Sequence, residues 1–266
     1  MALHAAVQAF SIATVNVLLH RGVDVSSVNG YRNSVLHDQY QPPSEDRWAM
    51  LEFLLNCGAP VDNENDEGET PLFCAALDSD TWFASRLLQR GANVNARSYN
   101  STPLHQAVAR NKAHMVEFLL DQGAKNDARD DDEMTPLHYL AKTAEISTKE
   151  IMKMLIDAGS EAMAIDRHRN TILHFAMGAK FAHGAYFRVN HCDINVNVRN
   201  HSGDTPLQCC VTAEHVRLLL RRGADVNAQN GEGRIALHLF AQKYSHEIVR
   251  LLVQNGCDVN ILDGKD

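Results

Sequence analysis

The chain has 266 residues, 45% of them hydrophobic, and a formal net charge of -8 at pH 7. No stretch approaches the roughly 20 consecutive apolar residues that a membrane helix needs, so a soluble protein without a membrane partner is expected. The acidic balance argues against a nucleic-acid partner, because neutralising phosphates requires a basic face.

The six cysteines have no paired spacing apart from the adjacent Cys209 and Cys210. They are interpreted as reduced thiols of a reducing compartment. A cytoplasmic location is therefore predicted, with the nucleus as the alternative.

One short motif recurs along the whole chain. Its leucine falls at eight positions, of which four belong to Thr-Pro-Leu triplets: Leu3, Leu36, Leu72, Leu104, Leu137, Leu173, Leu207 and Leu237. A period of roughly 33 residues indicates stacked units that each bury a face against their neighbours. Eight repeats are predicted, starting near residues 1, 34, 70, 102, 135, 171, 205 and 235, in a single domain over residues 1–266.

Each repeat predicts two helices and a loop. The first helix begins at Thr-Pro, because the threonine hydroxyl can cap a helix and proline suits the first helical position. A second apolar stripe, clearest over residues 116–120, ends at a glycine that supplies a left-handed cap. The polar segment that follows, such as residues 92–96, predicts a protruding hairpin-like loop.

Thr102-Pro103-Leu104-His105, together with Gly91-Ala92-Asn93-Val94-Asn95-Ala96, resembles the ankyrin repeat, and the match covers essentially the whole chain. The resemblance implies an all-α solenoid of about eight helix-turn-helix units with protruding hairpin loops. It further implies a concave face of first helices and loop tips that binds another protein. It implies no catalysis.

Four repeats depart from this pattern. Repeat two carries Pro42-Pro43 and extra residues, which predict a short or distorted first helix. Repeat five has a longer loop around residues 143–147. Repeat six lacks the terminal glycine, and its second helix is expected within residues 184–192. Repeat seven is three residues short, and residues 212–214 are expected to bridge its two helices.

The fourteen histidines raise the question of a metal site or an active site. Six of them follow the motif leucine, and the resemblance implies that these make hydrogen bonds between repeats: His4, His37, His105, His138, His174 and His238. Cys192 with His183 and His191, or Cys209-Cys210 with His201, lack the two spaced pairs of a zinc site. The sequence also contains no phosphate-binding loop, nucleophile elbow or His-Glu-x-x-His motif. No enzyme activity, metal, cofactor or small-molecule substrate is predicted.

The position two residues after the motif leucine is expected on the concave side of each first helix. Tyr139 and Phe175 form its aromatic centre, and Gln106 and Leu239 hold the same position in other repeats. Aromatic residues among polar ones are typical of interface hot spots. The alternative is that they serve only packing within the array.

A second candidate surface contains Tyr40, Trp48 and Trp82, which the repeat pattern places near the inter-helix loops of repeats two and three. Both tryptophans are expected to begin second helices. Local packing beneath Pro42-Pro43 is the alternative interpretation.

The predicted loop tips differ in charge. The tip between repeats four and five is acidic and includes Asp131 and Asp132, whereas the tip between repeats five and six is basic and includes Arg167 and Arg169. If all tips line one edge, this polarity would orient a partner of opposite polarity. The alternatives are scattered surface charge and, for residues 130–133, a solvated turn.

The sequence therefore predicts a noncatalytic module, or scaffold, that binds a partner protein through hairpin tips and concave helices. The alternatives are the substrate-targeting segment of a larger enzyme, such as a ubiquitin ligase or transferase, and an inhibitor that masks a transcription factor, as the ankyrin inhibitors of nuclear factor kappa B do. Related ankyrin asparagines can be hydroxylated, and Asn95, Asn227 and Asn260 occupy a comparable loop position; a structural role in the turn is the alternative.

Overall fold

The computed structural model describes residues 2–37, 44–98, 100–142, 148–179, 194–242 and 246–264. Its contacts divide the chain into two compact units, Met1–Lys125 and Asn126–Asp266. The regular secondary structure of these residues is helical, with three isolated β-bridges, so the predicted all-α class is confirmed. The single domain over residues 1–266 stays a prediction.

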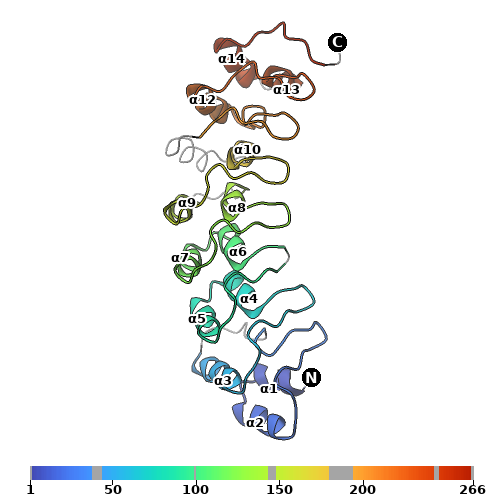
Figure 1. The fold of residues 1–266 in the computed structure, drawn as a ribbon, viewed down its shortest axis with the longest axis vertical. Helices are drawn as coiled ribbons and strands as arrows, with labels where there is room; N and C mark the ends of the chain where they lie inside the picture. Colours follow the sequence, from blue (N-terminus) through green and yellow to red (C-terminus); the bar gives the residue numbers. More distant parts are fainter. Residues whose placement is uncertain are drawn as a thin grey trace. The chain divides into compact units, whose positions relative to one another are not determined.

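The first unit contains helix pairs stacked on one another (Figure 1). Helix α4 packs against α5 of its own repeat and α6 of the next, and α6 packs against α7. The helices of this unit are α1 (Ala2–Gln8), α2 (Ile12–His20), α3 (Glu45–Asn56), α4 (Pro71–Asp78), α5 (Thr81–Gln89), α6 (Pro103–Ala109) and α7 (Ala113–Asp121).

The second unit repeats this arrangement. Helix α8 packs against α9 and α10, while α14 packs against α12 and α13. The helices of this unit within the described residues are α8 (Pro136–Lys142), α9 (Thr148–Asp157), α10 (Ile172–Gly178), α12 (Ala213–Arg221), α13 (Ala236–Gln242) and α14 (His246–Gln254).

The start of each first helix is fixed by the threonine and the histidine of the motif together. In repeat four, the backbone N–H of Thr102 donates to Nδ1 of His105 at 3.2 Å, and the two side chains are 2.9 Å apart. Because an N–H can only donate, Nδ1 must be an acceptor, which leaves the imidazole neutral with its proton on Nε2. The same geometry recurs at His37, His138 and His174.

The second nitrogen of this ring, Nε2, links one repeat to the next, as the resemblance implied. Nε2 of His4, His37 and His174 lies 2.8–3.1 Å from a backbone carbonyl in the following hairpin. Gln208 replaces the histidine in repeat seven, where its Oε1 accepts from Thr205 N at 2.7 Å and its Nε2 donates to Arg234 O at 2.8 Å. Histidine and Gln208 thus each supply an acceptor and a donor from one side chain at this motif position, which Phe73 holds in repeat three.

The glycines that end the second helices have φ values between 79° and 90°, as predicted for left-handed caps. The asparagines after them connect neighbouring repeats. Oδ1 of Asn95 accepts from Lys125 N at 2.8 Å, and Oδ1 of Asn227 accepts from Asp258 N at 2.8 Å. These bonds support the structural role of both asparagines; their hydroxylation stays a prediction.

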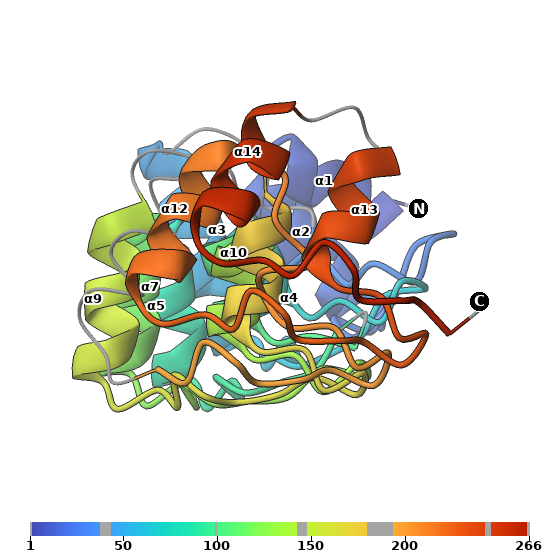
Figure 2. The same cartoon turned by 90° about the horizontal axis from the view of Figure 1, so that it is seen from above.

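The segments between repeats are hairpins that project to one side of the helices in each unit (Figure 2). An Asn or Asp begins most of them and accepts backbone N–H groups from its own turn, as Asn65 does from Glu67 and Glu69 at 2.9 Å. The residue three positions later has positive φ: Arg32, Gly68, Asn100, Glu133, Arg169, Gly203 and Gly233.

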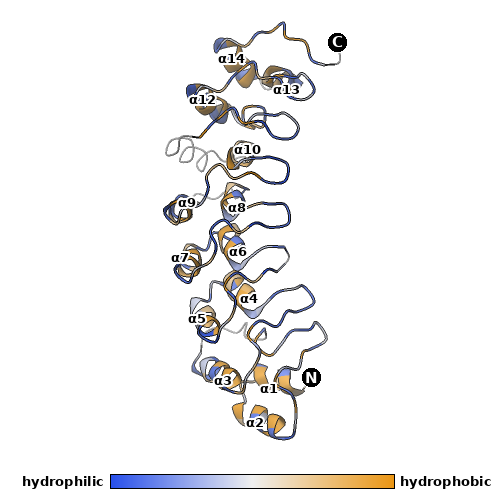
Figure 3. Ribbon diagram, viewed as in Figure 1, coloured by the Kyte–Doolittle hydropathy of each residue, from blue (hydrophilic) through white to orange (hydrophobic). Residues whose placement is uncertain are grey.

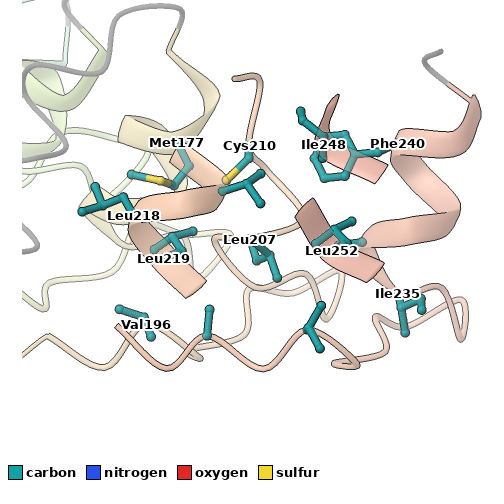
Figure 4. Close-up of a cluster of buried hydrophobic side chains, with 14 of the residues drawn as sticks. Met177, Val196, Leu207, Cys210, Leu218, Leu219, Ile235, Phe240, Ile248 and Leu252 are labelled. Carbon is teal, nitrogen blue, oxygen red and sulfur yellow. The ribbon is translucent and has the colours of Figure 1, made fainter. Parts of the chain in front are cut away.

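The core lies between the stacked helices and beneath the hairpins. In Figure 3 hydrophobic residues concentrate on the helices, while the hairpins are mainly hydrophilic. Figure 4 shows one cluster of the second unit, in which α12 and α14 contribute Leu219 and Leu252 around Leu207, all 1% exposed or less. Burying one such leucine stabilises a fold by about 1.5–3 kcal/mol.

Two repeats depart from the helix pair. In repeat two, residues 35–37 form a turn, in agreement with a short or distorted helix; residues 38–43 lie outside the described part. Repeat seven corrects the prediction of a helix at Thr205-Pro206. Residues 206–209 form a turn, with i to i+3 bonds such as Gln208 N to Thr205 O, because the shortened repeat leaves room for a single turn.

The segment predicted to bridge the helices of repeat seven also differs. Thr212 caps α12 by accepting from His215 N at 3.2 Å, and residues 213 and 214 already belong to that helix. Val211 N and His215 Nδ1 both contact the carbonyl of Met177 at the end of α10. The missing helix is thus replaced by hydrogen bonds to the preceding repeat. The second helix predicted for repeat six lies outside the described residues.

Candidate functional site

The structure places Tyr139 on α8 and Phe175 on α10, two first helices that pack against each other in the second unit (Figure 1). Both side chains are half-buried, in contrast to Cys74, which is buried at the same position in repeat three. Each aromatic residue therefore keeps part of its surface in contact with solvent.

Tyr139 connects its helix to the preceding hairpin. Its hydroxyl donates to Oδ2 of Asp130 at 2.9 Å. Oδ1 of Asp130 accepts from the backbone N–H groups of Asp132 and Met134, each at 2.8 Å. Burial, followed by the bond to Asp130, raises the pKa of Tyr139, so the phenol stays protonated and keeps its donor role.

Phe175 is held between two groups of α8. His138 meets its ring edge-on, with centroids 5.8 Å apart and planes at 90°, and Lys142 Nζ lies 5.0 Å from the ring centroid. Lys142 is exposed, so an ammonium group covers an aromatic surface at the solvent boundary. We call Tyr139, Lys142 and Phe175 the α8–α10 patch; the sequence did not identify Lys142.

The other two residues predicted for this surface lie on other first helices, Gln106 on α6 and Leu239 on α13. Gln106 belongs to the first unit, where its Nε2 donates to Ser101 Oγ at 2.9 Å and so steadies its own hairpin. Leu239 is half-buried on α13, which packs against α14 in the last repeat.

The two tryptophans lie together on the outer helices of the first unit, as their repeat positions predicted. The ring centroids of Trp48 on α3 and Trp82 on α5 are 5.5 Å apart, and the planes are tilted by 38°. Trp48 is 40% exposed, and the guanidinium of Arg86 lies 5.5 Å from the Trp82 ring centroid. Tyr40, predicted beside them, lies outside the described residues.

A buried ion pair lies close to this aromatic pair. Arg47 Nη1 is 2.6 Å from Asp80 Oδ2, and the side chains of Arg47 and Asp80 are 4% and 17% exposed. Asp80 also caps α5 by accepting from Phe83 N at 2.9 Å, and Arg47 lies over the Phe83 ring at 5.5 Å. This arrangement supports the packing interpretation for the tryptophans, because their neighbours join α3 to α5.

The charged tips of two neighbouring hairpins are joined rather than separate. Arg167 Nη1 is 2.8 Å from Asp132 Oδ1, and Arg167 N donates to Asp132 O at 2.9 Å. Asp131 and Arg169 are exposed. The acidic and basic tips therefore partly neutralise each other within the second unit.

Asp130 corrects the prediction of a fully solvated turn over residues 130–133. It is 8% exposed, and its carboxylate organises the hairpin. Asp166 does the same in the next hairpin, where it is 4% exposed and accepts from His168 N and Asn170 N. The recurrence of Asn or Asp at 29, 65, 130, 166, 200 and 230 was the pattern that could have revealed this role.

The chemistry of the cysteine and histidine side chains is limited. Within the described ranges, no group of three His, Cys, Asp or Glu side chains is arranged to hold a metal ion. Burial raises the pKa of the Cys210 thiol, which keeps it protonated and unreactive. The possible zinc cluster of His183, His191 and Cys192 lies outside the described residues.

A family model described as ankyrin repeats in three copies matches residues 44–130, 109–183 and 178–263. The mouse protein "Inversin" is 29% identical over 204 residues, covering 73% of this chain and 19% of that protein. Mouse "Neurogenic locus notch homolog protein 1" is 31% identical over 166 residues, which is 61% of this chain. Mouse "B-cell lymphoma 3 protein homolog" is 31% identical over 162 residues, which is 57% of this chain.

The chain spans only part of each of these relatives, 6% of the notch protein and 34% of the lymphoma protein homolog. None of the helices that the structure describes is long and apolar enough to cross a membrane.

Proposed function

Because the chain belongs to the ankyrin-repeat family, we propose that it is a noncatalytic module that binds a partner protein through first helices and hairpin tips. Such repeats present an extended surface on a stacked scaffold, and no reacting group is needed for that role. The α8–α10 patch is the proposed centre of the binding surface.

One observation carries this proposal: Phe175 is half-buried, backed by His138 and covered on one side by the exposed Lys142. An aromatic ring fixed by its own neighbours loses little conformational entropy on binding, which is the property of an interface anchor. Lys142 adds a cation that a partner carboxylate can approach. Tyr139 positions the adjacent hairpin through Asp130.

The test compares variants of the whole chain in binding to partner proteins captured by the wild type and then purified. Phe175→Ala should weaken binding by more than about 1 kcal/mol, roughly fivefold, if the ring is a hot spot. Tyr139→Phe keeps the aromatic ring and removes the hydrogen bond to Asp130. It therefore shows whether Tyr139 acts through ring contact with the partner or through its support of the hairpin. Affinities are measured by titration calorimetry.

Trp48→Ala is the matched control, since it truncates an exposed aromatic side chain in the other unit. It should leave partner affinity unchanged. If Phe175→Ala binds like the wild type while its circular dichroism shows a folded array, the α8–α10 patch is not the site. Loss of binding in Trp48→Ala alone would move the site to the outer helices of α3 and α5.

The two other functions stay predictions: the targeting segment of a larger enzyme and the inhibitor that masks a transcription factor. Both would also act by binding a protein, so the variants above would test the α8–α10 patch in either case. The cytoplasmic or nuclear location is likewise a prediction.

A further inference from the structure

Two hairpin tips of the second unit lie side by side and carry five basic residues. His201 N donates to His168 O at 2.9 Å, and Asn200 Nδ2 donates to Asn170 Oδ1 at 2.9 Å. The exposed side chains on these hairpins form what we call the basic tip patch: Arg167, His168, Arg169, Arg199 and His201.

We propose that the basic tip patch binds a short acidic peptide segment, two or three consecutive Asp or Glu residues, of the partner protein. The proposal rests on the proposed function and names the chemistry of one part of its partner. It concerns the hairpins rather than the α8–α10 patch, so the two can be tested separately.

The patch has more positive charge than its neighbours neutralise. Of its three guanidinium groups, that of Arg167 pairs with Asp132, which leaves a surplus of two. Among the residues that the structure describes, no carboxylate lies within ion-pair distance of Arg169, and Arg199 donates to the neutral carbonyl of Gln229. This surplus is notable in a chain of net charge -8.

Asp166 and Asp204, the acids at the base of these two hairpins, are occupied. Asp166 is buried and accepts from His168 N, Asn170 N and Asn170 Nδ2. Asp204 accepts from Asn230 Nδ2 at 2.8 Å. These acids serve the turns of the hairpins and leave the exposed arginines for an external anion.

The backbone at Arg169 accommodates glycine, which makes a clean test possible. Its φ is 61°, in the left-handed region that favours glycine. The equivalent position holds glycine in three other hairpins and a residue with a Cβ in the rest: Gly68, Gly203 and Gly233, and Arg32, Asn100 and Glu133. Arg32, in the first unit, therefore provides a matched comparison for Arg169.

The flanking charges favour a short acidic segment over a nucleic acid. Hairpin 130–134, which carries Asp131 and Asp132, contacts one side of the patch through Arg167 N and Asp132 O. Hairpin 230–234, which carries Glu232, contacts the other side through Gly231 N and Ser202 O at 2.8 Å. The phosphates of a polynucleotide would extend beyond the patch and be repelled by these carboxylates. Two or three peptide carboxylates fit within the patch and can each pair with a guanidinium group.

The experiment uses the full chain and a fluorescein-labelled peptide of Glu-Asp-Glu flanked by Gly-Ser, followed by fluorescence anisotropy. A Lys-Arg-Lys peptide and a short single-stranded oligonucleotide serve as comparison probes. The wild type should bind the acidic peptide best, and added salt should weaken this binding through screening.

Two substitutions remove the surplus charge and preserve the fold. Arg169→Gly places the residue of the equivalent hairpins in the turn. Arg199→Gln removes the charge but keeps a side-chain donor for Gln229 O. This donor is worth keeping because Gln229 itself donates to Leu262 O of the next hairpin at 3.3 Å. The double variant should bind the acidic peptide at least about tenfold more weakly, since charge-assisted bonds of this kind contribute strongly. Arg32→Gly should bind it like the wild type, and all variants should melt no earlier than the wild type.

Equal binding of the acidic peptide by the double variant and the wild type would overturn the proposal. So would the absence of acidic-peptide binding, or tighter binding of the oligonucleotide. With a purified partner, the double variant should also lose affinity. If the partner instead depends on Phe175 and binds the double variant normally, the proposed function stands and the basic tip patch does not contribute.

Discussion

The two units share the histidine bonds between repeats but differ in other contacts that hold neighbouring repeats together. In the first unit, the outer helices α3 and α5 are joined by the ion pair Arg47–Asp80 next to the tilted pair Trp48–Trp82. In the second unit, the hairpin backbones approach so closely that a Cβ on Gly203 would lie 2.5 Å from Gly231 N. The shared repeat motif therefore leaves room for local solutions, and aromatic residues alone do not identify a binding surface.

This difference has a consequence for function. The tryptophan pair lies next to an ion pair that joins α3 to α5, whereas the Phe175 ring of the α8–α10 patch contacts His138 and the exposed Lys142. The first arrangement is expected to stabilise the array, and the second is the proposed contact for a partner. Three sets of variants test this difference.

Arg47→Leu should produce the largest effect, a loss of about 2–4 kcal/mol in the stability of the first unit, because it leaves the half-buried carboxylate of Asp80 without its ion-pair partner. Urea unfolding followed by tryptophan fluorescence measures this, since both tryptophans lie in that unit. Arg86→Leu, which removes a 41% exposed arginine paired with Glu52, should cost less than about 1 kcal/mol.

Adding Asp80→Asn to Arg47→Leu should restore part of the loss. Asparagine still accepts from Phe83 N at the cap, and it carries no charge to bury. Similar small losses in Arg47→Leu and Arg86→Leu would show that the buried pair contributes little to holding α3 against α5.

Gly203→Ala and Gly123→Ala test the hairpin contact of the second unit. Both glycines have positive φ, 78° and 82°, so either alanine carries a backbone cost of about 1–2 kcal/mol. Only Gly203 also meets another backbone, whereas no atom lies within 4 Å of a Cβ at Gly123. Gly203→Ala should therefore be the more destabilising, by about 1 kcal/mol or more.

Hydrogen exchange at Gly231 N–H provides a local measurement, because this group donates to Ser202 O across the contact. Faster exchange is expected in Gly203→Ala and not in Gly123→Ala. Equal exchange rates in both variants would mean that the two hairpins can separate without loss.

The motif histidines should make both units less stable as the pH falls. Burial lowers the pKa of His37, His138 and His174, an effect that backbone hydrogen bonds partly offset. As the pH falls, the histidines of the unfolded chain, with pKa values of about 6.5, bind protons before those of the folded chain do. The contribution of these histidines to stability is therefore fully present above about pH 6.5 and declines below it. The limiting slope is about 1.4 kcal/mol per pH unit for each histidine.

Urea midpoints at pH 7.5 and 5.5 measure this decline. His174→Gln is the control, because Gln208 makes the equivalent bonds in repeat seven without titrating near neutral pH. The variant should lose less stability on acidification than the wild type. A midpoint that does not change with pH, or a variant with the slope of the wild type, would contradict the assigned neutral state of the ring.

Most of the repeat could be predicted because its determinants are local. Thr102 and His105 are three residues apart and fix one helix start by themselves, and a glycine after a helix takes a left-handed conformation without help from distant residues. The positions of Tyr139 and Phe175 on neighbouring first helices followed from the same repeat pattern.

The repeated motif was enough to predict the family, most helix starts and the glycine-capped helix ends, because it states these features many times; the first helix of repeat seven was predicted wrongly. Three contacts became known from the stacked structure: the ion pair of Arg47 with Asp80, the hydrogen bond from Tyr139 to the buried Asp130, and the bonds of Val211 and His215 to Met177 in repeat seven, which has a turn in place of its first helix. Such contacts join residues of different repeats, so they depend on how the repeats stack as well as on the local pattern.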